Sequence, residues 1–173
     1  MVLVVDFDGT LVRENSSRVL ESLLIRHSKF WGPFLVGLGK LIGYEGDFRR
    51  YVILNLSVKK YGPEKLKEAM KKTAEKLTVR EEFKNREFIV LSSGLLPVIM
   101  LTIKLNNLNA SKVYASKLSV VDNRITIREL TTKNKARILK ELSDKYGNVV
   151  YYTDDKNELV RLKCERIKVI IIK

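Results

Sequence analysis

The chain has 173 residues, 45% of them hydrophobic, which is enough to bury the core of one domain with or without an inserted unit. Its single cysteine, Cys164, cannot form an internal disulfide, so the composition excludes a disulfide-stapled fold and indicates a reducing compartment. The formal net charge of +13 favours an anionic ligand, nucleic acid or an acidic lipid surface, and does not choose among them.

The sequence carries no pattern typical of export or membrane insertion. The apolar run after Met1 ends at Asp6 without a basic start or a cleavage site. The longest other apolar segment, residues 30–43, has 14 residues and contains Lys40, so it is too short to span a bilayer. We therefore expect no transmembrane segment and a cytoplasmic location.

Gln is absent while Lys, Arg and Glu are abundant, a composition typical of heat-adapted proteins.

The first stretch, residues 2–5, is predicted to be a buried strand because it contains four consecutive apolar residues, three of them β-branched. Asp6 and Asp8 follow, two residues apart, so in extended backbone both carboxylates leave from one side. Such a pair repels unless a cation or a proton lies between them, which predicts a divalent metal or a raised carboxyl pKa. Gly9 lets the backbone turn closely around the ligand.

An isolated D-x-D-G pattern also occurs in two different kinds of loop. One is a surface Asp-Gly turn without a ligand, which this stretch alone does not exclude. The second is a calcium-binding loop, and it fails because Leu11 stands where such a loop needs Gly and Ser17 where it needs Glu.

Residues 12–86 are predicted to form a helical insertion, because their apolar residues recur at helical spacing. Residues 15–17 offer N-caps for a first helix, and Gly32-Pro33 interrupts the pattern. Three further helices are expected, over residues 34–42, from Asp47 onward and from Pro63 onward.

After the insertion, short apolar runs alternate with helical patterns, which predicts an α/β sheet. The expected strands are residues 88–91, 113–115, a hairpin over 120–127 that turns at Asp122-Asn123, 149–152 and 167–172. The expected helices are residues 97–106, 133–145 and 156–164.

Polar pairs follow three of the expected strands, and they are Asp6 with Asp8, Ser92 with Ser93, and Asp154 with Asp155. Ligands of such sheets bind at the carboxyl ends of the strands, so these side chains are expected to build one site. Together with a lysine, they supply the nucleophile, proton donor, hydroxyl and metal carboxylates that phosphoryl transfer needs.

On these residues the chain resembles the haloacid dehalogenase superfamily of phosphohydrolases, in its phosphoserine phosphatase-like branch. The first motif of that superfamily, D-x-D-G-T-L, is matched by residues 6–11. The second, an apolar strand ending in Ser or Thr, is matched by Leu91-Ser92 and followed by Ser93-Gly94. For the third, a lysine near the start of a helix, Lys135 fits better than Lys133 because a Lys-Ala-x-x-Leu pattern begins there.

The fourth motif usually reads G-D-x-x-N-D, and here it is Thr153 to Glu158. Asp154 matches, but Thr replaces the first Gly and Glu replaces the final Asp. Asp155 and Glu158 are expected to serve the outer shell of a metal, where Glu158 would accept from a metal-bound water. The substitutions are expected to weaken or alter metal binding without abolishing it.

The resemblance implies a fold and a division of the chain. The fold is a Rossmann-like parallel sheet sandwiched by helices, with a small all-helical cap inserted after the first motif. The catalytic core would comprise residues 1–12 and 86–173, and the cap residues 13–85, where the helical insertion lies.

The resemblance also implies roles for the site residues. Asp6 would attack phosphorus and form an aspartyl-phosphate, and Asp8 would protonate the leaving oxygen and later activate water. Mg²⁺ would be held by Asp6, the backbone carbonyl of Asp8, and Asp154, while the phosphoryl group would be bound by Ser92, Ser93, Gly94 and Lys135. Asp8 argues against carbon–halogen cleavage, because dehalogenating members lack that acid.

The expected substrate is a small phosphorylated metabolite. In phosphoserine phosphatases an acid shortly after the first motif reads the substrate amine, and here Asn15 falls at that position with Glu14 beside it, which argues against phosphoserine. Arg13, Arg49 and Arg50 are candidates to face an anionic substrate. The alternatives are a binding or regulatory module with weak catalysis, a phosphomutase, and a phosphatase for nucleic-acid ends or lipid phosphates. The sequence assigns no oligomeric state.

Overall fold

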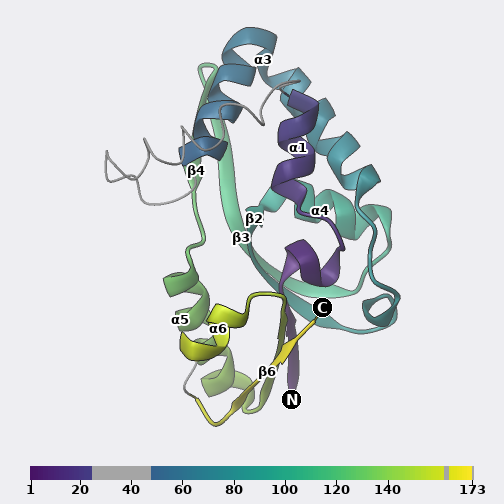
Figure 1. Cartoon of the computed structure of the whole chain (residues 1–173), viewed down its shortest axis with the longest axis vertical. Helices are drawn as coiled ribbons and strands as arrows, with labels where there is room; N and C mark the ends of the chain where they lie inside the picture. Colours follow the sequence, from purple (N-terminus) through teal and green to yellow (C-terminus); the bar gives the residue numbers. More distant parts are fainter. Residues whose placement is uncertain (25–47, 162–163, 173) are drawn as a thin grey trace.

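The computed structural model of the chain describes residues 1–24, 48–161 and 164–172. Its central feature is a six-stranded sheet with the order β4-β3-β2-β1-β5-β6 (Figure 1). Only β4 is antiparallel, to β3, and the other neighbours are parallel. The strands are β1 (Val2–Val5), β2 (Phe88–Leu95), β3 (Ala110–Val121), β4 (Arg124–Arg128), β5 (Val149–Thr153) and β6 (Ile167–Ile171). The predicted α/β fold is confirmed.

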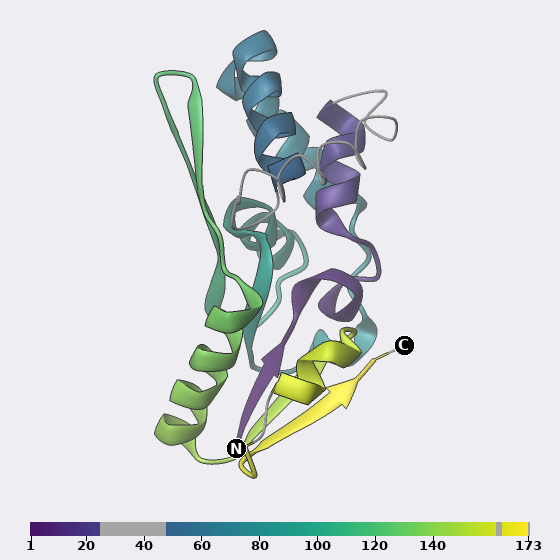
Figure 2. The same cartoon turned by 60° about the vertical axis from the view of Figure 1, so that its left-hand side comes forward.

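Helices cover both faces of the sheet (Figure 2). Val4 and Val5 are adjacent in β1 and therefore point to opposite faces, and each belongs to a different apolar cluster. Val5 packs in the cluster that contains α4 (Leu96–Leu105), whereas Val4 packs in the one that contains α5 (Thr132–Tyr146). This two-sided burial explains why β1 is apolar throughout.

Two helices lie beyond the carboxyl end of β1 and pack against each other, α1 (Ser16–Leu24) and α3 (Phe48–Lys76) (Figure 1). The helices expected from Asp47 and from Pro63 are joined in α3, which breaks at Gly62 with φ 79° and ψ 167°. A left-handed φ followed by proline suits such a break, because glycine tolerates that φ and proline begins a new helix. The expected helix over 34–42 and the Asp47 cap lie outside the described residues.

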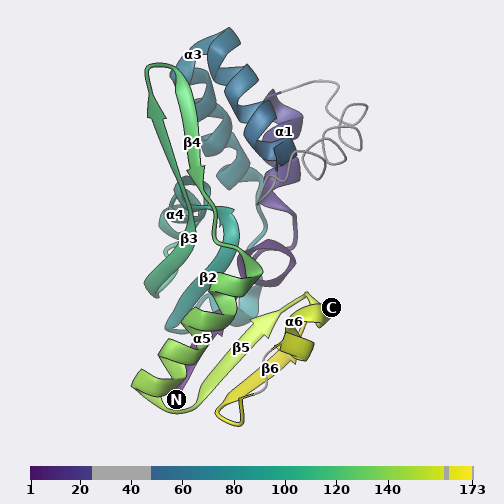
Figure 3. The ribbon, with the colours of Figure 1, turned by 90° about the vertical axis from the view of Figure 1, so that its left-hand side faces the viewer.

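The β3/β4 hairpin extends past the rest of the sheet and runs alongside α3 (Figures 1 and 3). Asp122 and Asn123 form its turn with φ values of 48° and 58°, as the sequence predicted. The prediction of a short strand over 113–115 separate from the hairpin is wrong, because β3 continues unbroken over 12 residues. The hairpin's inner residue Ile125 is buried in the cluster that contains α3, so tertiary packing extends the strand.

The two segments that connect α1 and α3 to the sheet are hydrogen-bonded to each other. Val12 and Val79 form an antiparallel bridge, the Arg13 N–H donates to the Thr78 carbonyl over 3.1 Å, and the Arg80 N–H donates to the Leu11 carbonyl over 3.0 Å. The chain therefore leaves the sheet toward α1 and returns from α3 at the same place, beside the end of β1.

Within the described residues, no helix has the length and apolar character needed to cross a membrane.

Candidate active site

The chain turns sharply after β1, in the irregular helical turn η1 (Phe7–Leu11). Asp8 and Gly9 depart from helical geometry there, and Gly9 has a φ of 70°, which a side chain would strain. The Phe7 N–H donates to Asp6 Oδ1 over 2.7 Å, which fixes the Asp6 carboxylate at the end of the strand. The backbone of η1 therefore places both acids at one edge of the sheet.

Lys135 connects Asp6 to the fourth motif. Its Nζ donates to Asp6 Oδ2 over 2.7 Å and to Glu158 Oε1 over 3.1 Å, and all three side chains are buried. The Tyr151 hydroxyl donates to Glu158 Oε2 over 2.6 Å and lies 3.4 Å from Lys135 Nζ. Lys133, the alternative for the third motif, is exposed, so the geometry favours Lys135.

The protonation of this network follows from burial and charge. Burial raises the pKa of the Asp6 carboxyl to about 6, although Lys135 opposes the shift. Burial disfavours the charge on Lys135, but the carboxylates of Asp6 and Glu158 outweigh it and raise the pKa of that ammonium. Burial and the same two carboxylates raise the pKa of Tyr151, so its hydroxyl stays a donor. Lys135 is therefore a cation held between two acids.

Asp8 is held by the start of α1. The Ser16 N–H donates to Asp8 Oδ1 over 2.7 Å, which leaves Oδ2 directed toward the end of β2. Burial raises the pKa of the Asp8 carboxyl, and this favours the protonated form that a general acid needs. A Cβ placed on Gly94 would lie 3.5 Å from Asp8 Oδ2 and 3.2 Å from Ser92 Oγ, so the bare glycine leaves room around both.

The end of β2 presents Ser92 and Ser93 to the same edge. Ser92 is buried, and its Oγ accepts from the Gly94 N–H over 3.0 Å. The Ser93 carbonyl accepts twice, from Arg50 Nη1 over 3.0 Å and from the Ser116 hydroxyl over 2.7 Å. The end of β2 that carries these serines is thus fixed by a helix and by a neighbouring strand.

The fourth motif departs from the family pattern at two residues, and both have partners. The Thr153 hydroxyl accepts from the Asp155 N–H over 3.1 Å, which tightens the turn after β5. Glu158 lies in α6 (Lys156–Arg161) and uses both carboxylate oxygens on Lys135 and Tyr151. Asp155 accepts from the Asn157 backbone and side-chain N–H groups over 2.8 and 3.0 Å. Thr153 therefore stabilises the turn after β5, and Glu158 binds Lys135.

These elements enclose a cavity of about 530 Å³, named the carboxylate cavity. It gathers all four predicted catalytic residues and the predicted metal carboxylates, together with two cationic side chains from the segment after η1. Its lining residues are Asp6, Asp8, Gly9, Arg13, Asn15, Arg18, Ser92, Ser93, Lys135, Asp154, Asp155 and Glu158.

The carboxylate cavity also fits a hard divalent cation. The Asp154 carboxylate lies against the loop that carries Asp8, since a Cβ on Gly9 would clash with Asp154 Oδ2. Mg²⁺ is typically bound by one or two carboxylates with water and phosphate oxygens completing its shell, and Asp6 with Asp154 match that donor set. In the described part of the chain, no three His, Cys, Asp or Glu side chains are grouped to hold a metal.

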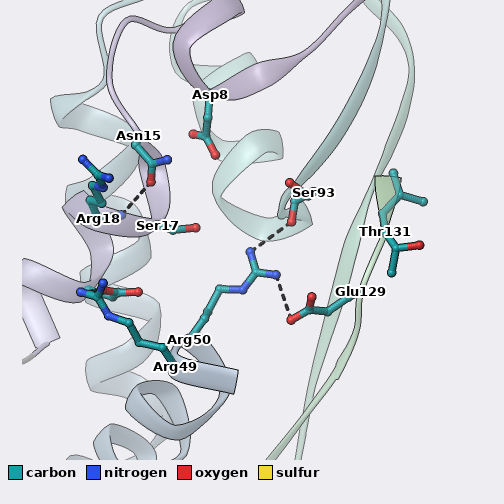
Figure 4. Close-up of a pocket in the computed structure, with 11 residues that line it drawn as sticks. Asp8, Asn15, Ser17, Arg18, Arg49, Arg50, Ser93, Glu129 and Thr131 are labelled. Carbon is teal, nitrogen blue, oxygen red and sulfur yellow. Dashed lines mark hydrogen bonds and ion pairs between the residues drawn. The ribbon is translucent and has the colours of Figure 1, made fainter. Parts of the chain in front are cut away.

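A second cavity of about 490 Å³, the arginine cavity, adjoins the first (Figure 4). Both cavities are lined by Asp8, Asn15, Arg18 and Ser93. Arg49 pairs with the buried Glu21, and Arg50 Nη2 pairs with Glu129 Oε1 over 3.1 Å. The remaining lining residues are Ser17, Leu130 and Thr131.

The residues of the inserted segment that were predicted to contact substrate do not all lie in the same cavity. Arg13 lines the carboxylate cavity, Arg49 the arginine cavity and Asn15 both. Glu14 lines neither, because its Oε2 accepts from the Thr78 N–H over 2.8 Å between the connecting segments.

Sequence reasoning missed Arg18 and Tyr151. Arg18 follows Asn15 by three residues, so helical spacing alone places it on the same face. Tyr151 offered no such signal, because aromatic residues are ordinary in buried strands.

Comparison with known proteins assigns the family. The sequence profile of the haloacid dehalogenase-like hydrolase family matches residues 3–157. The chain belongs to the haloacid dehalogenase-like hydrolase family. The predicted superfamily is therefore confirmed. No curated protein matches the sequence.

Solved structures show that this family member has the fold of phosphoserine phosphatases. A phospho-aspartyl intermediate analogue of phosphoserine phosphatase is 20% identical with a TM-score of 0.58, over 99% of this chain and 93% of that chain. A family hydrolase from Salmonella enterica serovar Typhi is 14% identical with a TM-score of 0.59, over 91% and 57% of the two chains. This chain therefore spans 57% of the length of the Salmonella protein.

Proposed function

We propose that this haloacid dehalogenase-like hydrolase is a Mg²⁺-dependent phosphatase that hydrolyses small phosphomonoesters through an aspartyl-phosphate on Asp6. The observation that supports it most is the carboxylate cavity. There the ends of β1, β2 and β5 bring Asp6, Asp8, Ser92 and Asp154 together with Lys135 of α5. The similarity in fold to phosphoserine phosphatases is consistent with this chemistry.

In the first half-reaction, the Asp6 carboxylate attacks phosphorus and the bond to the leaving oxygen breaks. Asp8 donates its proton to that oxygen, so the product leaves as a neutral alcohol. Lys135 and the Ser92 hydroxyl hold the phosphoryl oxygens while the charge moves. Asp6 then carries the phosphoryl group as a mixed anhydride.

In the second half-reaction, Asp8 accepts a proton from water as the water oxygen attacks phosphorus, and the bond to Asp6 breaks. Inorganic phosphate leaves and both aspartates return to their starting states. Asp6, the Asp8 carbonyl and Asp154 would hold Mg²⁺, which would supply positive charge to offset the charge on the phosphoryl oxygens.

The lining of the two cavities supports a small polar substrate. Among the residues that the structure describes there, Leu130 is the only large apolar side chain, and none is aromatic. Nucleobases bind proteins by stacking on aromatic rings, and lipids bind apolar surface. We therefore place a small polar phosphomonoester ahead of nucleic-acid ends and lipid phosphates.

The Asp6→Asn substitution tests the reaction. Asn has nearly the same shape but is a poor nucleophile, so turnover of p-nitrophenyl phosphate should fall by at least about 10³-fold. Steady-state kinetics with Mg²⁺ measures the loss, and circular dichroism checks that the fold is unchanged. Asp144→Asn, an exposed change on α5, is the matched control.

Chelation tests the metal in the same assay. EDTA should abolish turnover by the wild-type chain and added Mg²⁺ should restore it. Full turnover in EDTA would refute the metal dependence, and unchanged turnover by the Asp6→Asn variant would refute the nucleophile.

A further inference from the structure

The arginine cavity is in the position that a leaving group would occupy. Asp8 and Ser93 line both cavities, so an ester whose phosphoryl group lies beside Asp6 passes Asp8 and continues into the arginine cavity. Asp8 protonates the leaving oxygen in the proposed reaction, and this oxygen joins the two parts of the substrate. The chemistry of the arginine cavity therefore bears on substrate choice.

Two of its three arginines are held by acids of the chain. Arg49 pairs with Glu21. Arg50 donates to both Glu129 and the Ser93 carbonyl (Figure 4). Glu21, Glu129 and Arg50 are largely buried, with side-chain exposures of 5%, 11% and 6%. These contacts build the wall of the cavity and fix the end of β2 that carries Ser93.

Arg18 differs from these two arginines. It is exposed, lines both cavities, and forms no ion pair within residues 1–24, 48–161 and 164–172, although its backbone N–H donates to Asn15 Oδ1 over 3.0 Å. That bond occupies the Asn15 oxygen, and Figure 4 shows the two residues side by side at the cavity. A guanidinium binds a carboxylate in a two-pronged arrangement and repels an ammonium.

From this arrangement we infer that the arginine cavity binds an acidic group on the leaving alcohol, with the Arg18 guanidinium as its direct partner. The substrate class is a phosphomonoester of a small hydroxy acid that carries no amine. This inference rests on the proposed phosphatase function and adds its specificity. Asn15 supports it, because an uncharged amide gives a substrate ammonium no counter-charge.

The test compares two substrates that differ at one group. 3-Phosphoglycerate and glycerol 3-phosphate carry the same phosphate, but the first ends in a carboxylate and the second in a hydroxymethyl group. Wild-type protein with Mg²⁺ should have a higher kcat/KM for 3-phosphoglycerate, and Arg18→Gln should lower that preference by about 10- to 100-fold. Any contact of Arg18 with the shared phosphate would lower both values together. Arg124→Gln, an exposed change in the hairpin, is the matched control.

A binding measurement separates this inference from the proposed function. Calorimetric titration of the Asp6→Asn protein with the same two compounds reports recognition without turnover. Tighter binding of 3-phosphoglycerate that Arg18→Gln removes supports the inference even if the wild type hydrolyses nothing, which would refute only the phosphatase function. Equal binding of the two compounds, an equal loss for both in Arg18→Gln, or a preference for phosphoserine over 3-phosphoglycerate would overturn it.

Discussion

Tyr151 accounts for the unusual glutamate in the fourth motif. The sequence predicts Glu158 in the outer shell of a metal, whereas the structure shows its two oxygens on Lys135 and Tyr151. A glutamate in a short helix reaches both donors, and a buried carboxylate needs them because an unpaired charge there is costly. We expect Tyr151 to be a positioning residue that acts on the phosphoryl group through Glu158 and Lys135.

Tyr151→Phe removes only the hydroxyl of this arrangement. The ring still fills the core, so the fold should persist, but Glu158 loses a donor and Lys135 is held less firmly. We expect kcat/KM for p-nitrophenyl phosphate to fall by about 5- to 30-fold, or about 1–2 kcal/mol. If Tyr151 acts through Glu158, the same change in a Glu158→Gln background should have little further effect, whereas full additivity would contradict the relay. Tyr152→Phe is the neighbouring control.

The site shows which residues sequence can predict. Strand ends and motif spacing predict that Asp6, Asp8, Ser92, Lys135 and Asp154 share one site, and the structure places all five around one cavity. The contacts of Glu158 and Arg50 were not found, because their partners come from segments distant in the chain.

At the level of elements, the hairpin shows how packing decides strand length. Residues 116–119 are Ser-Lys-Leu-Ser, a polar interruption that separated two expected strands. In the structure Leu118 packs on one face of the hairpin while Lys117 and Ser119 are exposed on the other, so the interruption is the alternation of a half-covered strand. The sequence could not reveal which element covers that face, and α3 does so.

Asn55 on α3 fastens this hairpin. Its Oδ1 accepts from the Ile125 N–H over 2.9 Å and its Nδ2 donates to the Ile125 carbonyl over 3.5 Å. Both backbone polar groups of Ile125, on the outer edge of β4, therefore have a hydrogen-bond partner. Asn55→Ala should lower the free energy of unfolding by about 1–3 kcal/mol, because a buried N–H is left unpaired. Chemical denaturation measures the loss, and hydrogen exchange should show faster exchange at Ile125. Ser119→Ala, on the exposed face, should change neither.

On the scale of the whole molecule, the sheet separates two apolar clusters, and the carboxylate cavity lies at the end of the strands between them. Folding therefore buries the carboxylates of Asp6 and Glu158 along with the core. Asp6 is 7% exposed and its pKa is raised to about 6, so the site opposes the stability of the fold at neutral pH. Such a cost is expected where a reactive charge is held ready for a ligand.

The pH dependence of unfolding measures this cost. Well below pH 3.8 Asp6 is protonated in both states. As the pH rises through 3.8 toward about 6 the carboxyl ionises first in the unfolded chain, so the fold loses stability across that interval. Asp6→Asn carries no such charge. In EDTA, the free energy of unfolding of Asp6→Asn minus that of the wild type should increase by about 2 kcal/mol from pH 4 to pH 7. Urea denaturation at each pH provides the values, with Asp144→Asn as the control. A constant difference between wild type and variant across this range would mean that Lys135 fully offsets the burial of Asp6.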